Sequence, residues 1–164
     1  MTSLELARVA LGLKEVRRSG WVREGHPDAE SVADHSWSVS LLALLLCPPE
    51  LNREKLLIMA ILHDLAEVRI GDITPQDGIP PGEKHAREDA AMADLLADHP
   101  DLLETWREAE ARQTPEARFL KGLDGLEMGL QADRYVGAGA LSEIVAAQFR
   151  KSAGELYRTL GVLR

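Results

Sequence analysis

The stretch LLIMAILHDLAEVRIGD, residues 56–72, places ionisable side chains directly after an apolar run. His63 and Asp64 stand side by side at the end of a segment rich in Leu and Ile, and Glu67 and Asp72 follow closely. Burying an unpaired carboxylate is costly, so such a group is normally hydrogen-bonded, salt-bridged or bound to a metal. The stretch therefore predicts a buried helix that carries charged groups to one point inside the protein, with Glu67 one turn beyond His63 on the same face.

The whole chain predicts an all-α fold. The 164 residues are 45% hydrophobic but only 4% aromatic, which favours helices built from Leu, Ala and Val over sheets. No strand-like alternation of useful length occurs, and the length suits one domain over residues 1–164. We expect irregular loops over 22–31 and 69–83. We expect helices over residues 3–17, 31–47, 52–68, 83–100, 101–112, 114–136 and 142–159.

Several residues mark where these helices begin and pack. Asn52 and Thr114 are suitable N-caps, and Pro115 suits the first position of a helix. Gly122 and Gly125 each weaken the helix over 114–136 by about 1 kcal/mol relative to Ala. Their presence predicts close packing or close backbone approach beside Asp124, the residue between them.

Charge and composition restrict the partners of the protein. A net charge of −8 argues against binding a nucleic-acid polymer, which requires a basic surface. The apolar runs at 41–47 and 56–62 are too short to span a membrane, and the N-terminus lacks the features of a signal peptide. The only cysteine, Cys47, can form no intramolecular disulfide. We therefore expect a cytoplasmic protein that binds a small molecule.

Four residues of metal-ligand type fall on three predicted helices. His35 shares a helical face with Val39, and Asp124 lies within the apolar segment FLKGLDGLEM. In a helical bundle these two residues could meet His63 and Asp64 at one point. Two imidazoles and two carboxylates suit an octahedral divalent ion such as Mn²⁺, Co²⁺, Ni²⁺, Fe²⁺ or Mg²⁺, with positions left for water or substrate. A structural zinc site is disfavoured because it usually needs several cysteines.

The order of these ligands resembles the metal motif of the HD-domain phosphohydrolase superfamily. The segments KEVRRSGWV, ESVADHSW, LHDLAEVRIGDITP, GEKHAREDAAM and FLKGLDGLEMGLQA together resemble the 5′-deoxynucleotidase family of small HD-domain proteins. The resemblance extends from about residue 13 to residue 135. Residues 136–164 lie outside it, and we assign them to packing or oligomerisation as a C-terminal helix.

The resemblance implies a single HD-domain helical bundle and a role for each motif residue. It implies a phosphatase that removes the 5′-phosphate of deoxynucleoside monophosphates with a divalent cation, Co²⁺ or Mn²⁺ or a similar ion (Mg²⁺, Ni²⁺, Fe²⁺ or Zn²⁺). It also implies a homodimer. The implied residues are His35, His63, Asp64 and Asp124 as metal ligands, Glu67 and Asp72 as catalytic acids or bases, and Arg18 and Trp21 as contacts of the phosphate and nucleoside.

Two positions depart from the family pattern. Ser19 and Gly20 separate Arg18 from Trp21, whereas arginine and tryptophan are adjacent in some relatives. Ala33 stands where relatives often carry serine. The first departure leaves open whether Trp21 contacts substrate or is a packing anchor after a helix end.

Simpler interpretations stand beside each assignment. His35 alone could be a core histidine, His63 and Asp64 could bond to the backbone, and Asp72 could shape a turn. The alternative functions are an HD-domain hydrolase of a triphosphate or signalling nucleotide, and a non-enzymatic protein that binds metal or nucleotide. The first lacks a basic cluster to hold a polyphosphate, and the second would need neither Glu67 nor Asp72.

Overall fold

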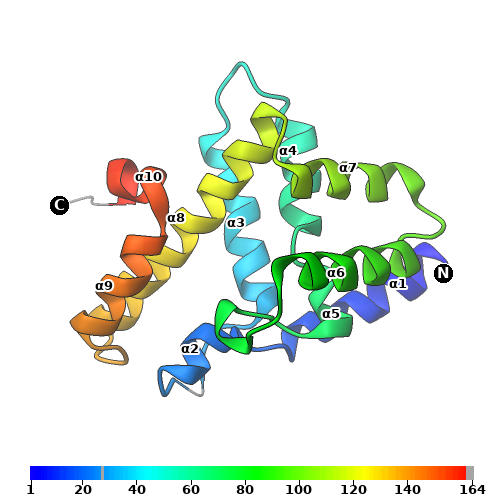
Figure 1. The fold of residues 1–164 in the computed structure, drawn as a ribbon. Helices are drawn as coiled ribbons and strands as arrows, with labels where there is room; N and C mark the ends of the chain where they lie inside the picture. Colours follow the sequence, from blue (N-terminus) through cyan, green and yellow to red (C-terminus); the bar gives the residue numbers. More distant parts are fainter. Residues whose placement is uncertain (27, 162–164) are drawn as a thin grey trace.

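The computed structural model describes residues 1–26 and 28–161, and this part of the chain is helical with no β-strand. One isolated β-bridge joins Arg17 and Ser31. None of the described helices combines the length and hydropathy needed to cross a lipid bilayer. The predicted all-α fold is confirmed (Figure 1). The elements are α1 (Ser3–Ala10), η1 (Leu11–Lys14), α2 (Ser19–Arg23), α3 (Val32–Leu46), α4 (Arg53–Leu62), α5 (Glu67–Ile70), η2 (Pro75–Asp77), α6 (Pro81–Leu95), α7 (Pro100–Ala111), α8 (Pro115–Gly137), α9 (Glu143–Ser152), α10 (Gly154–Leu156) and η3 (Tyr157–Gly161).

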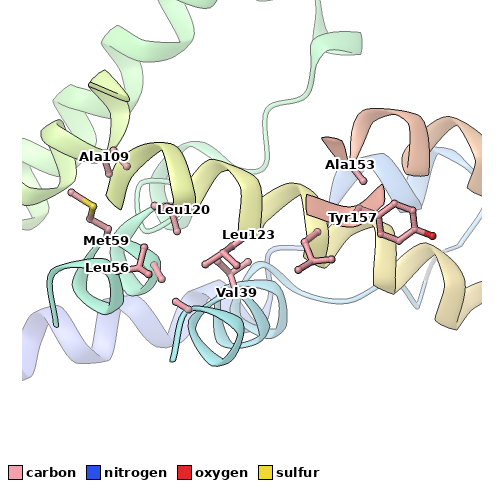
Figure 2. Packing of buried hydrophobic residues seen from close by; sticks show 12 residues of the cluster. Val39, Leu56, Met59, Ala109, Leu120, Leu123, Ala153 and Tyr157 are labelled. Atoms are coloured by element: carbon pink, nitrogen blue, oxygen red, sulfur yellow. The ribbon is translucent and has the colours of Figure 1, made fainter. Parts of the chain in front are cut away.

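Three helices, α3, α4 and α8, pack against one another and form the centre of the fold (Figure 1). Their shared core contains Val39, Leu56, Met59 and Leu123, all fully buried (Figure 2). α7 packs on α4 and α8, while α9 packs along α8. One face of each central helix is therefore directed toward the other two. The predicted meeting of ligand-type residues from three helices requires this arrangement.

Two smaller cores fix the outer elements. Trp106 of α7, Leu95 of α6 and Leu13 of η1 belong to one of them. Trp21 of α2 and Tyr135 of α8 belong to the other, together with residues of α9. The second cluster attaches α2 to the C-terminal half of the chain, so α9 lies next to α2.

The predicted helix starts are confirmed by their capping bonds. The Asn52 side chain accepts a hydrogen bond from the Lys55 amide, and Thr114 accepts one from the Ala117 amide. Ser31 forms a capping box at the start of α3. These caps satisfy amides that have no partner within the helix, which explains why local sequence sufficed to locate them.

The predicted continuous helix over 52–68 is wrong, because α4 ends at Leu62. Residues 63–66 form a tight turn in which the Glu67 amide bonds the Asp64 carbonyl at 3.1 Å, a three-residue span. The His63 carbonyl instead accepts a hydrogen bond from the indole N–H of Trp106 at 3.4 Å. A side chain of α7 thus takes the place of a helical amide, and Glu67 starts a new short helix rather than continuing α4.

The first and last predicted helices are also interrupted. The segment expected as one helix over 3–17 divides into α1 and the 3₁₀ helix η1, and the expected loop over 22–31 begins only after α2 ends at Arg23. The expected helix over 142–159 stops at Ser152, because Gly154 adopts a positive φ of 83°. A new short helical segment then folds back along α8.

The glycines of α8 allow the C-terminal segment to pack back along this helix. A Cβ atom at Gly125 would overlap the Ala153 carbonyl, and one at Gly122 would overlap the side chain of Leu156. The predicted close approach beside Asp124 is therefore confirmed, and its partner is the C-terminal segment. Glycine lowers the stability of α8, but it leaves the space that this segment needs in order to pack against the helix.

Candidate active site

Three of the four residues predicted as metal ligands, His35, His63 and Asp64, have donor atoms within 4.8 Å of one another, and Asp124 joins them beside His35. His35 Nε2 lies 3.4 Å from Asp124 Oδ1 and 3.6 Å from Asp64 Oδ2. His63 Nε2 lies 3.3 Å from Asp64 Oδ2 and 3.3 Å from His35 Nε2. His35 comes from α3, His63 and Asp64 from the turn after α4, and Asp124 from α8. The three central helices therefore assemble the cluster that the sequence predicted.

Hydrogen bonds at the far side of each imidazole orient the two rings. His35 Nδ1 lies 2.6 Å from Glu127 Oε2, and His63 Nδ1 lies 2.8 Å from the Ala60 carbonyl oxygen. With the Nδ1 proton donated to these oxygens, both Nε2 lone pairs face the same point. This arrangement is typical of metal-binding histidines, whose second nitrogen donates to a carboxylate or carbonyl.

The electrostatics of the cluster favour positive charge at its centre. Burial and the Arg18 guanidinium lower the pKa of His35, but hydrogen bonds to Asp124 and Glu127 outweigh them and raise it to about 10. Burial also lowers the pKa of His63, and Asp64 raises it by more. The carboxylates thus stabilise protons on imidazoles that are otherwise too buried to ionise. A divalent cation would satisfy the same field, so the donor set fits one.

Two basic residues neutralise the carboxylates of the cluster. Burial raises the pKa of Asp64, but His63 and Arg18 together lower it well below its usual range. Arg18 Nη1 lies 3.5 Å from Asp64 Oδ2, and Lys121 Nζ lies 2.7 Å from Asp124 Oδ2. Lys121 therefore pairs with the outer oxygen of Asp124 and leaves Oδ1 facing His35.

Glu67 lies beside the cluster, and its pKa is raised, whereas that of Asp64 is lowered. Its side chain is 4% exposed, and among the described residues its Oε2 atom has no hydrogen-bond partner. Burial raises the pKa of Glu67 to about 10, and the charges of Asp64 and Asp72 add to the effect. A buried carboxyl oxygen without a partner, next to a candidate metal site, can exchange a proton with a water or substrate.

Asp72 connects the loop after α5 to the start of α2. Its Oδ2 atom accepts a hydrogen bond from the Ser19 amide at 2.6 Å, and its backbone carbonyl accepts one from the Ser19 hydroxyl at 2.9 Å. Arg18 Nη1 lies 3.4 Å from Asp72 Oδ1. Arg18 therefore lies between Asp64 and Asp72, at the edge of the cluster.

Trp21 has the geometry of a packing anchor. Only 2% of its surface is exposed, and its indole N–H donates to Glu30 at 3.0 Å. Its ring lies 3.9 Å, centroid to centroid, from Phe149 of α9 and meets Tyr135 edge-on. Trp21 nevertheless lies next to the cavity beside the cluster, to whose lining it contributes together with Phe149.

The cluster opens into a cavity of about 960 Å³. A cavity of this size can hold a nucleotide. Arg18, His63, Asp64, Glu67, Asp72 and Asp124 all contribute to its lining. Lys84 and Glu88 of α6 also line it, and Phe149 contributes from α9.

Two residues of the site were not predicted from the sequence. Glu127 is 4% exposed and orients His35, and Phe149 supplies an aromatic surface to the cavity. A pattern did exist for Glu127, because it follows Asp124 by one helical turn within an apolar segment. Phe149 lies in the region assigned only to packing, and its place depends on how α9 packs.

The described chain is thus an all-helical protein with a candidate divalent-metal site, made of two histidines and two aspartates that are buried or partly buried. The model of the HD domain family matches residues 11–160. The chain belongs to this family.

Known relatives of the chain carry an enzymatic name. The human protein named 5′-deoxynucleotidase HDDC2 is 39% identical over 137 residues, covering 80% of this chain and 67% of that protein. The Schizosaccharomyces pombe protein named 5′-deoxynucleotidase hdd1 is 36% identical over 132 residues, covering 75% of this chain and 67% of the relative. A solved structure of a conserved hypothetical protein from Pyrococcus furiosus matches with a TM-score of 0.81 and 33% identity, covering 97% of this chain and 94% of the other.

Proposed function

We propose that the protein is a metal-dependent phosphohydrolase that removes the 5′-phosphate from deoxynucleoside 5′-monophosphates. The observation that carries the proposal is the convergence of His35, His63, Asp64 and Asp124 at one end of a cavity, with the unpartnered carboxyl of Glu67 beside them. The relatives named 5′-deoxynucleotidase support the substrate class.

We assign the four converging residues as ligands of a divalent cation, with Mn²⁺ or Co²⁺ as the first ions to test. A cation held there would polarise the phosphoryl oxygens and acidify the attacking water. Glu127 and the Ala60 carbonyl hold the two imidazoles in the ligand orientation. Because Asp64 lies 3.5 Å from Arg18, the guanidinium is close enough to the cluster to bind the same phosphate bidentately.

Glu67 takes the proton of the attacking water in this proposal. Its raised pKa makes the carboxylate a stronger base than an exposed glutamate, and positive charge entering the site favours its ionised form. Water adds to phosphorus, the P–O5′ bond breaks, and the leaving oxygen gains a proton. Asp72 either positions the water or delivers that proton.

The nucleoside is proposed to lie along the outer cavity, against α9. Phe149 offers its ring there, while Trp21 lies beneath it and holds it in position. Trp21 therefore remains in the proposal as a nucleoside-site residue, acting mainly through Phe149. Replacing Phe149 by Ala should raise KM for a deoxynucleotide while leaving metal affinity unchanged.

The decisive experiment measures phosphate release from each deoxy- and ribonucleoside monophosphate, and from di- and triphosphates, across a series of divalent metals. Preferential hydrolysis of deoxynucleoside monophosphates supports the proposal. Turnover of triphosphates or a cyclic signalling nucleotide instead would favour another HD-domain hydrolase. Metal-dependent nucleotide binding without phosphate release would favour a non-enzymatic protein.

We also propose that the protein acts as a homodimer in the cytoplasm, with residues 1–164 forming one domain. The lone Cys47 is consistent with a reducing compartment, and the net charge of −8 is consistent with a small-molecule substrate rather than a nucleic-acid polymer. The localisation can be tested by fractionating cells that produce the protein.

A further inference from the structure

One face of α3 exposes a stripe of large apolar side chains to solvent. Trp37 is 67% exposed and Leu45 is 68% exposed, and Leu41 and Leu44 between them are also exposed. Spacings of four, three and one residues put these side chains on one side of the helix. We call Trp37, Leu41, Leu44 and Leu45 the α3 stripe.

The opposite face of α3 fixes the orientation of the stripe. His35, Val39 and Ala43 are fully buried, and His35 bonds Glu127 of α8. Rotating α3 to bury the stripe would remove His35 from the cluster. The stripe is therefore not part of the core of one chain, and α3 contributes no residue to the described lining of the cavity.

The α3 stripe lies in a part of an acidic chain that has no charges. Residues 36–49 contain no Asp, Glu, Lys or Arg, whereas the whole chain carries a net charge of −8. Two copies of such a chain repel each other over most of their surfaces. Contact through the α3 stripe brings no carboxylate of this segment against another. The lack of basic residues also argues against docking on an anionic membrane.

The size of the stripe is compatible with the centre of a dimer interface. Its four side chains are between 38% and 68% exposed and adjoin one another, and an exposed apolar patch of this kind commonly marks an interaction site. A standard interface buries about 800 Å² from each partner, of which the outer part is a polar rim. The stripe can therefore supply the apolar centre, with neighbouring residues completing the contact.

Trp37 and Leu45 occupy symmetric positions about Leu41, four residues before it and four residues after it. Two antiparallel α3 helices related by a twofold axis near Leu41 would place Trp37 against the partner's Leu45. A twofold interface requires this kind of self-complementarity. We propose that a second copy of this chain binds the α3 stripe, forming an antiparallel α3–α3 dimer with Trp37 as its main anchor.

The proposed interface stabilises α3, the helix that carries His35 two residues before Trp37. It leaves the cavity open, because the stripe and His35 lie on different faces of α3. The inference does not depend on the phosphatase proposal, since oligomeric state and phosphate release are separate measurements.

The test is the molar mass of the intact protein, measured by light scattering after size-exclusion chromatography and by sedimentation equilibrium. The unaltered chain is expected at twice its 18.0 kDa mass. Trp37→Glu combined with Leu45→Glu is expected to give the monomer mass with unchanged helical circular dichroism. The control is Ile144→Glu on α9, where an isoleucine 79% exposed receives one such charge and the dimer should persist.

A milder substitution tests the same interface if the double substitution unfolds the protein. Trp37→Ala should raise the dimer dissociation constant by about 30-fold or more, the effect expected of an interface hot spot. A monomeric unaltered chain at every concentration would overturn the inference. A dimer that is insensitive to Trp37→Ala, or one that dissociates equally with Ile144→Glu, would also overturn it.

Discussion

Two corners of the same cavity hold carboxyl groups whose pKa values are shifted in opposite directions. Asp64 lies among His63, His35 and Arg18, which lower its pKa well below the usual range. Glu67, three residues later, has no such partner on its Oε2 atom among the described residues, and burial together with the charges of Asp64 and Asp72 raises its pKa to about 10. Burial raises the pKa in both cases, so the difference comes from the neighbouring charges. The first corner is suited to hold a cation, and the second is suited to move a proton.

Replacing Asp64 by Asn should have the largest effect, because it removes the charge that balances the proposed cation and Arg18. We expect loss of metal binding and a fall in turnover of more than about 1,000-fold, beyond the contribution of proton transfer alone. Calorimetric metal titration and phosphate release measure the two effects. Asp94→Asn, at an exposed aspartate of α6, is the control. Full metal binding in the Asp64 variant would refute its role as a ligand.

Replacing Glu67 by Gln should separate the effect on proton transfer from the effect on metal binding. Turnover should fall by about 100-fold or more, because general acid–base catalysis contributes at least that much, while metal affinity stays within a few-fold. The control is Glu83→Gln, which changes an exposed glutamate paired with Arg87. Near-normal turnover in the Glu67 variant would exclude it as the base, and lost metal binding would make it a ligand instead.

Replacing Glu127 by Gln should weaken the first corner without abolishing it. The amide keeps a hydrogen bond to His35 but removes the charge, so metal affinity should fall by about 10- to 100-fold. At saturating metal, turnover should recover to within a few-fold of the unaltered enzyme. Turnover that stays low at saturating metal would show that Glu127 does more than orient His35.

The pH dependence of metal binding gives the most graded effect, because it changes step by step with pH rather than with one substitution. The pKa of His35 is raised to about 10, so below that pH the ring carries a second proton, which must leave when metal binds. Apparent metal affinity should therefore fall as pH falls from 9 to 6, by up to about tenfold per pH unit for each proton displaced. Titrations in buffers of different ionisation enthalpy count the released protons. A pH-independent affinity with no proton release would contradict this expectation.

The predictions that succeeded depend on local chemistry. The caps at Ser31, Asn52 and Thr114 each involve a side chain and an amide three residues away, so sequence alone contains the information. The apolar surroundings of the four ligand-type residues and the family resemblance also predicted that they lie near one another, while their role as metal ligands stays a prediction.

The predictions that failed depend on contacts between distant residues. α4 ends at Leu62 in a turn where Trp106, far along the chain, binds the His63 carbonyl. The C-terminal helix breaks at Gly154 and packs against glycines that lie about 30 residues earlier in α8. The orientation of Trp21 and the burial of Glu127 likewise follow from packing, which no local pattern encodes.

The tight turn over residues 63–67 restricts how the chain can change in length. Its amides bond carbonyls three residues back, so each added residue would rotate Glu67 by about a third of a turn away from the cavity. One insertion or deletion there would uncouple the proton-transfer group from the cation ligands without altering any of them. Length variation between the two corners is therefore excluded.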